Sequence, residues 1–383
     1  MKAIAITGTR GFIENTAFMP TNKVMQAVGN NTGNLVFQYA VYNMITEPKL
    51  IVGQDISWDP KAIRDACRAV VVPSANFIRE NFDMTGYVDF LEKTELPLIF
   101  LGIGAQAENY TTRDFDFHPS IQRLLGLIRE RSKKVAVRGY FTAELFEKFG
   151  INHVEVTGCP SNFINQSPDF ADMIEAKLAQ PLNSFITHGD EPWPKNMAKQ
   201  PVERRLCDWT MKGNSFQSQQ SVPIFMEYIR RNNTHAPAVI PEGRENALHR
   251  ALLPDAPFET FQEFINARMR VYLSVSQWME DSARFDFSVG LRLHGNMVAW
   301  QAGTPALWIH HDSRTRELSE IMALPSIDFE TFLEQCTTIE EARQKIEFDK
   351  HAYRTQRRRL AERMHTVLDS EKISNSLTQT VLA

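Results

Sequence analysis

Short apolar runs alternate with stretches of helical spacing through the first half of the chain. Strands are predicted at 3–7, 50–52, 69–72, 98–102, 135–137 and 153–156. The segments between them carry apolar residues at the spacing typical of helices. Strands that alternate with helices form βαβ units, in which the strands lie parallel in one sheet. The pattern therefore predicts an α/β domain over residues 1–165, with a break near residues 165–169.

The second half follows the same rhythm with more interruptions. Strands are predicted at 185–187, 271–275 and 306–309, and helices at 202–209, 223–230, 278–283 and 339–368. Residues 232–257 are rich in turn formers and predict no long element. The polar, proline-broken loop at 188–194 is suited to lining a cleft. The pattern permits a second Rossmann-like domain at 166–340, followed by a helical tail at 341–383.

A strand-to-helix junction at residues 285–303 carries the candidate chemistry. Its first part predicts a strand interrupted by Arg292 and His294, and helical spacing begins after Gly295. Open parallel sheets bind ligands beyond the carboxyl ends of their strands, where the next helix points its N–H groups at the ligand. Residues two positions apart on a strand share a face, so both side chains can reach one anion. The alternative is a structural Arg paired with a carboxylate and a core His bonded to backbone.

Composition indicates an ordinary soluble globular protein. The chain has 383 residues, of which 43% are hydrophobic and 23% charged, and its net charge of −4 argues against nucleic acid as a partner. No apolar run is long enough to span a membrane, and the N-terminus does not resemble a signal peptide, so a cytoplasmic location is expected. The cysteines lie far apart, which predicts buried thiols and neither zinc nor disulfides: Cys67, Cys159, Cys207 and Cys336.

Two glycine-rich turns resemble dinucleotide fingerprints, but each lacks the context that such a site needs. In the turn at 7–14, Glu14 stands where a glycine would let backbone approach a pyrophosphate. The turn at 101–107 is followed by a polar loop at 108–117, where the fingerprint requires an apolar helix. No nicotinamide site is therefore predicted.

Three segments of the C-terminal half resemble the signature of the polysaccharide pyruvyl transferase family. They are Gly-Leu-Arg-Leu-His-Gly-Asn-Met at 290–297, Ala-Gly-Thr-Pro-Ala-Leu at 302–307, and His-Asp-Ser-Arg-Thr-Arg-Glu-Leu at 311–318. The resemblance covers about residues 1–345. It implies two Rossmann-like domains that face each other across a cleft, as in the GT-B fold.

The resemblance also implies an activity. Such an enzyme moves an enolpyruvyl-derived group from phosphoenolpyruvate to two hydroxyls of a sugar, forms a pyruvate ketal on a surface polysaccharide or its lipid-linked precursor, and releases phosphate. No cofactor and no metal are implied. His294 would be the acid, with a pKa near the working pH. Arg138 and Arg292 would hold the donor's carboxylate and phosphate; the alternative for Arg138 is a surface ion pair.

Further substrate-binding residues are carried over from the family's motifs. Asn31, Gly33 and Asn34 match an Asn-x-Gly-Asp pattern in which Asn34 replaces the acid. Asn31 or Thr32 could instead simply cap the following helix. Gln106 matches a Gly-x-Gly-x-Gln turn, and Gly295 belongs to the motif that carries His294.

The helix predicted after His311 has two cations in its first turn, which oppose the helix dipole. Asp312 or Ser313 is its natural N-cap, and Arg314 and Arg316 follow. These cations require a compensating anion, which is either Glu317 or the phosphate of the donor. Ser313, Arg314 and Arg316 are therefore candidate donor-binding residues.

The helical tail is rich in arginine, at positions 354, 357, 358, 359 and 363. Such a run forms either a solvated face or a contact with an anionic membrane surface, here the inner face of the membrane with its lipid-linked oligosaccharide acceptor. Two rival functions remain open for the chain. One is a GT-B glycosyltransferase that uses a nucleotide sugar, and the other is a non-catalytic glycan-binding relative, which Asn34 would favour.

Overall fold

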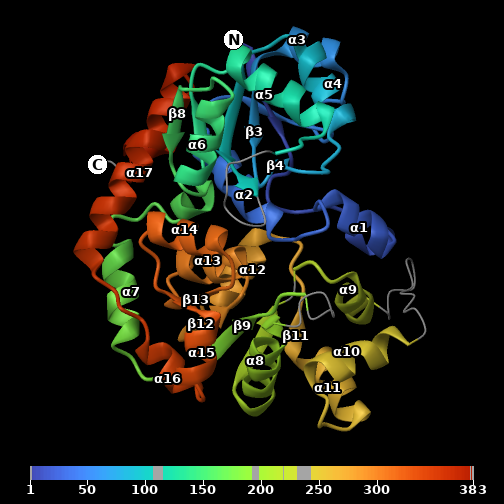
Figure 1. Cartoon of the computed structure of the whole chain (residues 1–383), viewed down its shortest axis with the longest axis vertical. Helices are drawn as coiled ribbons and strands as arrows, with labels where there is room; N and C mark the ends of the chain where they lie inside the picture. Colours follow the sequence, from blue (N-terminus) through green and yellow to red (C-terminus); the bar gives the residue numbers. More distant parts are fainter. Residues whose placement is uncertain are drawn as a thin grey trace.

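Two parallel β-sheets, each flanked by helices, form the upper and lower halves of the molecule (Figure 1). The computed structural model describes residues 2–106, 115–191, 198–218, 220–230, 243–379 and 381. The sheets have the strand orders β2-β1-β3-β5-β7-β8 and β11-β10-β9-β12-β13-β14. In both, neighbouring strands joined by helical crossovers run parallel. The prediction of two Rossmann-like domains is confirmed.

The first sheet is fully apolar at its centre, where helices cover both faces. All six residues of its central strand β5 are buried, as parallel sheets require. Its strands are β1 (Ala3–Thr7), β2 (Lys49–Val52), β3 (Cys67–Pro73), β5 (Leu98–Ile103), β7 (Val135–Val137) and β8 (Val154–Val156). Its helices are α1 (Thr21–Ala27), α2 (Asn34–Met44), α3 (Pro60–Ala66), α4 (Thr85–Thr94), α5 (Pro119–Arg131) and α6 (Tyr140–Lys148). Two short strands, β4 (Ile78–Arg79) and β6 (Ala105–Gln106), pair beside the sheet, and a 3-10 turn η2 (Pro160–Phe163) follows it.

The second sheet is built from residues 185–328. Its strands are β9 (Phe185–His188), β10 (Ser215–Ser218), β11 (Met269–Arg270), β12 (Phe287–Gly290), β13 (Ala306–His310) and β14 (Ser326–Asp328). Its helices are α8 (Gln200–Lys212), α9 (Pro223–Arg230), α10 (Arg244–Leu252), α11 (Phe258–Arg268), α12 (Val275–Ser282), α13 (Leu293–Gln301), α14 (Ser313–Ile321), α15 (Phe329–Gln335) and α16 (Ile339–Gln344). The connecting helix α7 (Phe170–Leu178) lies between the two halves of the sequence.

One strand prediction for the second half is wrong. The strand expected at 271–275 lies earlier, at β11, because the segment after it bonds to the first domain instead of the sheet. The N–H of Ile13 donates to the Leu273 carbonyl at 3.1 Å, and the N–H of Val275 donates to the Gly11 carbonyl at 2.9 Å. The turn-rich stretch at 232–257 contains the helix α10, while residues 231–242 lie outside the described part.

The C-terminal helix α17 (Lys350–Ser370) returns to the first domain and packs against β7, β8 and α7 (Figure 1). The prediction of a solvated arginine face is wrong for Arg357, which is buried. Its Nε donates to the Asn162 carbonyl at 3.0 Å, and its guanidinium lies 4.9 Å from the centre of the Phe170 ring. Arg358 and Arg359 are exposed. Among the described residues, no helix is both long and apolar enough to cross a membrane.

An apolar cluster joins the two domains beside α2. It contains Val24, Leu35 and Val36 from the first domain, and Met226, Val275, Trp278 and Val298 from the second. The N–H of Thr32 crosses the same boundary to the Gln220 carbonyl at 2.9 Å. This continuous packing brings the N-terminus of α2 to the N-terminus of α13, where the candidate site lies.

Candidate active site

The Arg-Leu-His-Gly motif lies at the start of a helix and not on a strand. Strand β12 ends at Gly290, Arg292 is the N-cap of α13, and His294 is the second residue of that helix. The prediction that both side chains share one strand face is therefore wrong. The side chain of Asn296 ends the strand, because its amide donates to the Gly290 carbonyl at 2.9 Å and to the Leu307 carbonyl at 3.3 Å.

His294 is buried at the boundary between the domains. Its Nε2 lies 3.5 Å from the sulfur of Cys159, and its ring centre lies 5.6 Å from that of Phe37. Burial, as the largest cause, and the charges of Arg138 and Arg292 together lower the pKa of His294 to about 3. The expectation of a pKa near the working pH is thus wrong for the ligand-free protein, in which the imidazole is neutral. The four cysteines are buried thiols as predicted, but Cys159 belongs to this site.

Arg138 follows strand β7 and is 6% exposed. Its Nε donates to the Gly102 carbonyl at 2.8 Å and its Nη2 to the Ser74 carbonyl at 3.1 Å, while its guanidinium lies 5.5 Å from the centre of the Phe37 ring. Within the described ranges, no carboxylate forms an ion pair with it, so the alternative of a surface ion pair is wrong. Burial lowers the pKa of Arg138, and a buried cation of this kind is stabilised by a bound anion.

Arg292 is held by an acidic residue from the loop after β9. Its Nη2 lies 2.5 Å from Asp190 and also donates to the Ser221 hydroxyl, whereas its Nε is buried without a hydrogen-bond partner in the described part of the chain. Asp190 also bonds Lys199 at 2.8 Å. Burial would raise the pKa of Asp190, but Arg292 and Lys199 outweigh it and keep that pKa below its usual range. The alternative of a structural Arg paired with a carboxylate therefore holds for the Nη2 of Arg292, but not for its Nε.

Arg314 lies close enough to both Arg138 and Arg79 for its charge to act on them. Burial lowers the pKa of Arg79, and the charge of Arg314 lowers it further; Arg314 also lowers the pKa of Arg138. Arg314 pairs with Asp312 at 2.8 Å. Gln106 stands opposite Arg79 in the register of β4 and β6, next to this group. Arg79 could not be recognised from residue patterns, because a two-residue strand has no periodicity to detect.

Two residues of the Asn-x-Gly-Asp-like segment bond to backbone. The Oδ1 of Asn31 accepts from the Gly33 N–H at 2.8 Å, and the Nδ2 of Asn34 donates to the Val28 carbonyl at 3.0 Å. Both amides thus shape the turn before α2, but the alternative that Asn31 or Thr32 caps this helix is wrong, because its N-cap is Gly33 and no described side chain forms a capping bond there.

The two motif glycines allow close approach of the helix N-termini. A Cβ at Gly33 would lie 2.6 Å from the Gln220 side chain and 3.2 Å from the Cβ of His294. A Cβ at Gly295 would lie 2.5 Å from the ring of His188. Both positions are too crowded for a larger residue, so these glycines position His294 by letting α2, α13 and β9 pack closely.

The residues predicted to bind the donor at the start of α14 have different surroundings. Asp312 is the N-cap, since its carboxylate accepts from the Thr315 N–H at 2.7 Å; the side chain of Ser313 lies outside the described part. Arg316 is 64% exposed and bonds Glu320 at 2.8 Å, so it lies outside the cationic group. Asp312 and Glu320, and not Glu317, form the ion pairs of Arg314 and Arg316 among the described residues. The carboxylate of Glu317 reaches the first domain, where it accepts from the Phe141 N–H at 3.0 Å.

Sequence reasoning missed His311 and Asp190 as members of the site. The Nε2 of His311 lies 4.0 Å from Asp190, its Nδ1 is buried without a hydrogen-bond partner among the described residues, and burial lowers its pKa to about 4. Glu203 accepts from the N–H of Asp190, and its pKa is raised to about 8 by burial and by the Asp190 charge. Both His311 and Asp190 follow predicted strands, which was the one available signal.

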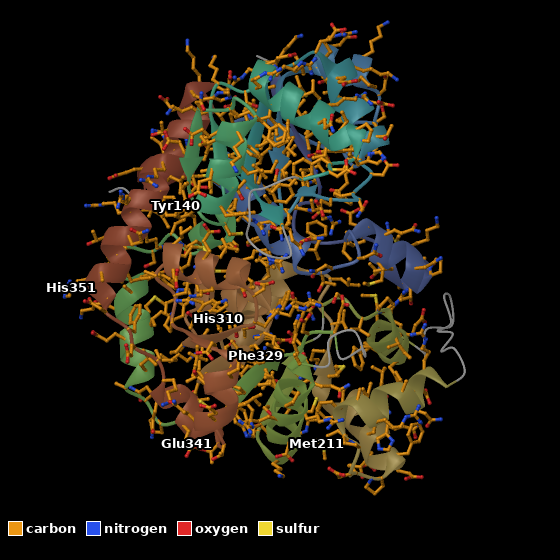
Figure 2. The ribbon with its side chains drawn as sticks, viewed as in Figure 1. Tyr140, Met211, His310, Phe329, Glu341 and His351 are labelled. Carbon is orange, nitrogen blue, oxygen red and sulfur yellow. The ribbon has the colours of Figure 1, made fainter. Side chains whose placement is uncertain are left out.

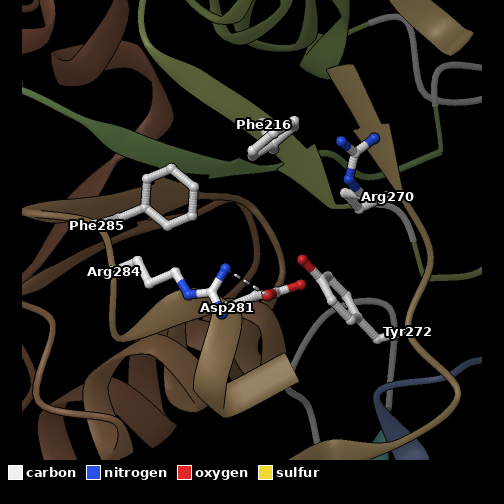
Figure 3. Close-up of a pocket in the computed structure, with 6 residues that line it drawn as sticks. All are labelled: Phe216, Arg270, Tyr272, Asp281, Arg284 and Phe285. Atoms are coloured by element: carbon white, nitrogen blue, oxygen red, sulfur yellow. Dashed lines mark ion pairs between the residues drawn. The ribbon is translucent and has the colours of Figure 1, made fainter. Parts of the chain in front are cut away.

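Two cavities lie apart from these charges. One of about 210 Å³ is shown in Figure 3 and is lined by Phe216, Arg270, Tyr272, Asp281, Arg284 and Phe285. The other, of about 600 Å³, lies against α7 and α17 and is lined in part by Arg354, Arg357, Arg358 and Arg359. None of the predicted site residues lines either one. Convergent charge, and not the size of a cavity, therefore identifies the site.

Cations from both domains lie around His294 at the boundary between two Rossmann-like domains. The chain matches the polysaccharide pyruvyl transferase family over residues 30–313, most of its length, and it belongs to that family. Family membership places the chain among transferases. No curated protein matches the chain.

Solved structures show only a weak likeness. UDP-GlcNAc 2-epimerase from Neisseria meningitidis bound to UDP-GlcNAc is 11% identical with a TM-score of 0.45, and the match covers 96% of this chain and 100% of that one. The UDP-GlcNAc 2-epimerase from Methanocaldococcus jannaschii is 11% identical with a TM-score of 0.42, over 91% and 92%. The wall teichoic acid polymerase TagF is 11% identical with a TM-score of 0.40, over 97% and 90%. At these scores the likeness carries no argument about the substrate or the reaction.

Proposed function

We propose that the chain transfers an enolpyruvyl-derived group from phosphoenolpyruvate to a sugar and forms a pyruvate ketal on a surface polysaccharide or its lipid-linked precursor. The supporting observation is the Arg138 guanidinium, buried at the domain boundary without a carboxylate partner among the described residues. Such a charge is costly unless an anion joins it. A small donor with both a carboxylate and a phosphate fits a site that has Arg138 on one side and Arg292 on the other.

The reaction balances without a redox step. The methylene carbon of the donor gains a proton and becomes a methyl group, and a sugar hydroxyl attacks the neighbouring carbon as it loses its proton. The bond from that carbon to the phosphate oxygen breaks, and phosphate leaves with the bonding electrons. A second hydroxyl of the same sugar then closes the ketal and loses its proton. One donor and one sugar give one ketal and one phosphate.

Each described side chain has a role in this reaction. His294 gives the proton to the methylene carbon, since it is the titratable group whose pKa responds to both Arg138 and Arg292. Arg138 holds one anionic group of the donor from the first domain, and Arg292, whose side chain is 18% exposed, holds the other. Arg314 adds a third cation to the same anion. Because the donor is a trianion, its arrival also favours the protonated imidazole.

The acceptor belongs to the same proposal. A lipid-linked oligosaccharide would be presented at the inner face of the membrane, and the exposed Arg358 and Arg359 beside the 600 Å³ hollow support a peripheral contact with an anionic surface. Sedimentation with vesicles that contain or lack an anionic lipid tests this part. Binding that needs the anionic lipid and is lost in an Arg358→Gln, Arg359→Gln double variant supports it. Equal binding to both kinds of vesicle, or none, contradicts it.

Phosphate release tests the central proposal. Purified protein with phosphoenolpyruvate and a polysaccharide extract should release phosphate, and His294→Ala should lower the rate by about 10²- to 10⁴-fold while donor affinity stays within a few-fold. A nucleotide sugar is the matched control donor. Turnover of the nucleotide sugar in place of phosphoenolpyruvate would identify a glycosyltransferase, and binding of glycan without turnover of either donor would identify a glycan-binding protein.

A further inference from the structure

A carboxylate of the second domain sits at the N-terminus of a helix in the first. The Oε1 of Glu317, on α14, accepts from the N–H of Phe141 at 3.0 Å, in the first turn of α6. Figure 1 shows α14 below α6 across the domain boundary, and Figure 2 marks that boundary with Tyr140 on one side and His310 on the other. A negative charge there is stabilised by the helix dipole and by the unpaired N–H groups of the first turn.

The absence of a side chain at Gly139 leaves room for this carboxylate. Gly139 has φ −156°, an extended conformation that any residue adopts, so its backbone does not require glycine. A Cβ at this position would lie no farther than 2.7 Å from either oxygen of Glu317. Space for the carboxylate therefore explains the glycine, and an alanine here would push Glu317 away.

The contact joins the two elements whose charges repel. Arg138 immediately precedes Gly139 and α6, and Arg314 lies one helical turn before Glu317 on α14. Arg314 lowers the pKa of Arg138, which means that the two guanidiniums repel each other across the boundary. Asp312 pairs with Arg314 and offsets part of this repulsion; the part that remains favours separation of α6 from α14 when no ligand anion lies between the two guanidiniums. The bond from Glu317 opposes that separation.

We propose that Glu317 is a positioning residue that keeps the two-domain anion site assembled before a ligand arrives. It acts through the α6 N-terminus and sets the distance between Arg138 and Arg314. A bound polyanion bridges the same two cations, so the contact matters most in the ligand-free protein and least in the complex. Loss of the contact should weaken donor capture and leave the chemical step unchanged.

Three variants test this from both sides of the contact. Glu317→Ala removes the carboxylate, Gly139→Ala displaces it, and the double variant does both. In Glu317→Ala, hydrogen exchange at the Phe141 amide should speed up roughly 10- to 100-fold, as expected for the loss of a hydrogen bond to a charged group. Gly139→Ala by itself should speed up exchange at the Phe141 amide by a similar factor. In the Glu317→Ala background it should change that exchange rate by less than about twofold, because the effects of coupled sites are not additive.

The measurement of donor KM and kcat rests on the proposed function, whereas the measurement of hydrogen exchange at Phe141 does not. The donor KM should rise about tenfold in both single variants, with kcat within about twofold. Arg316→Gln, on the exposed face of the same helix, is the matched control and should change neither quantity. Glu317→Gln should restore part of the protection at Phe141, since it keeps an acceptor but not the charge.

Two results would overturn the inference. One is unchanged exchange at Phe141 in both single variants, and the other is additive effects in the double variant. If the exchange changes as expected but no donor turnover is seen in any variant, the contact stands and the proposed reaction fails.

Discussion

Protonation of His294 should depend on the donor, and this makes donor binding sensitive to pH. In the ligand-free protein burial and two arginines hold the pKa of His294 at about 3. At pH 7 only roughly one imidazole in 10⁴ is then protonated, because each pH unit above the pKa is a factor of ten. An acid role therefore requires the donor itself to raise this pKa.

The magnitude follows from the charges at the site. The donor adds three negative charges to the site, and we count one of them at contact distance from the ring. At about 4 Å and an effective dielectric constant of 20, one unit charge contributes about 4 kcal/mol. That is about three pKa units at 1.36 kcal/mol each, so the pKa in the complex should be about 6.

The sign of the effect is fixed by these two values. Between pH 3 and about 6 the complex holds one proton more than the free protein, so donor affinity falls up to tenfold for each unit that pH rises. Above about pH 6 this dependence on His294 disappears. Calorimetry at pH 5 in two buffers of different ionisation enthalpy measures the proton uptake directly. His294→Gln is the control, because the donor's own titration contributes equally to both proteins.

The expected result is an uptake close to one proton greater in the wild type than in His294→Gln. Equal uptake in the two proteins would show that His294 stays neutral in the complex. The acid in the reaction would then have to be another group, and the reasoning from Arg138 and Arg292 to the pKa of His294 would be refuted.

Two further predictions concern the arginines of α14 and the pH dependence of stability. Arg314→Gln should raise the donor KM about tenfold, the effect of losing a charged hydrogen bond, while Arg316→Gln leaves it within about twofold because Arg316 bonds Glu320 in solvent; steady-state kinetics decides, and equal effects would contradict the placement of Arg316. The free energy of unfolding should fall by about 2.5 kcal/mol between pH 6 and pH 5, as measured by urea denaturation. In that range the unfolded chain gains protons on three histidines that stay neutral when folded, and Glu203 offsets one of them because it is already protonated in the folded state. A stability independent of pH here would contradict the lowered pKa values of His188, His294 and His311.

The parallel sheets could be predicted because each of their central strands is recognisable from its own residues alone. A central parallel strand is buried on both faces, so residues 69–72 of β3 and the whole of β5 appear as unbroken apolar runs that need no knowledge of their neighbours. Strands without such a run were missed, as β10 and β14 were, since β10 carries Ser215, Gln217 and Ser218 in a buried setting. These polar residues are buried by contacts with distant elements.

Two α/β domains and the importance of Arg138, Arg292 and His294 could be predicted from residue order, because local patterns and motif spacing are sufficient for both. Which charges meet depends on the folded chain. Arg292 has a carboxylate partner in Asp190, about a hundred residues away, whereas Arg138 has none among the described residues packed around it. Burial and charge at a site are sums over residues that are neighbours in space, so the low pKa of His294 and the contact of Glu317 with α6 could not be obtained from the order of residues along the chain.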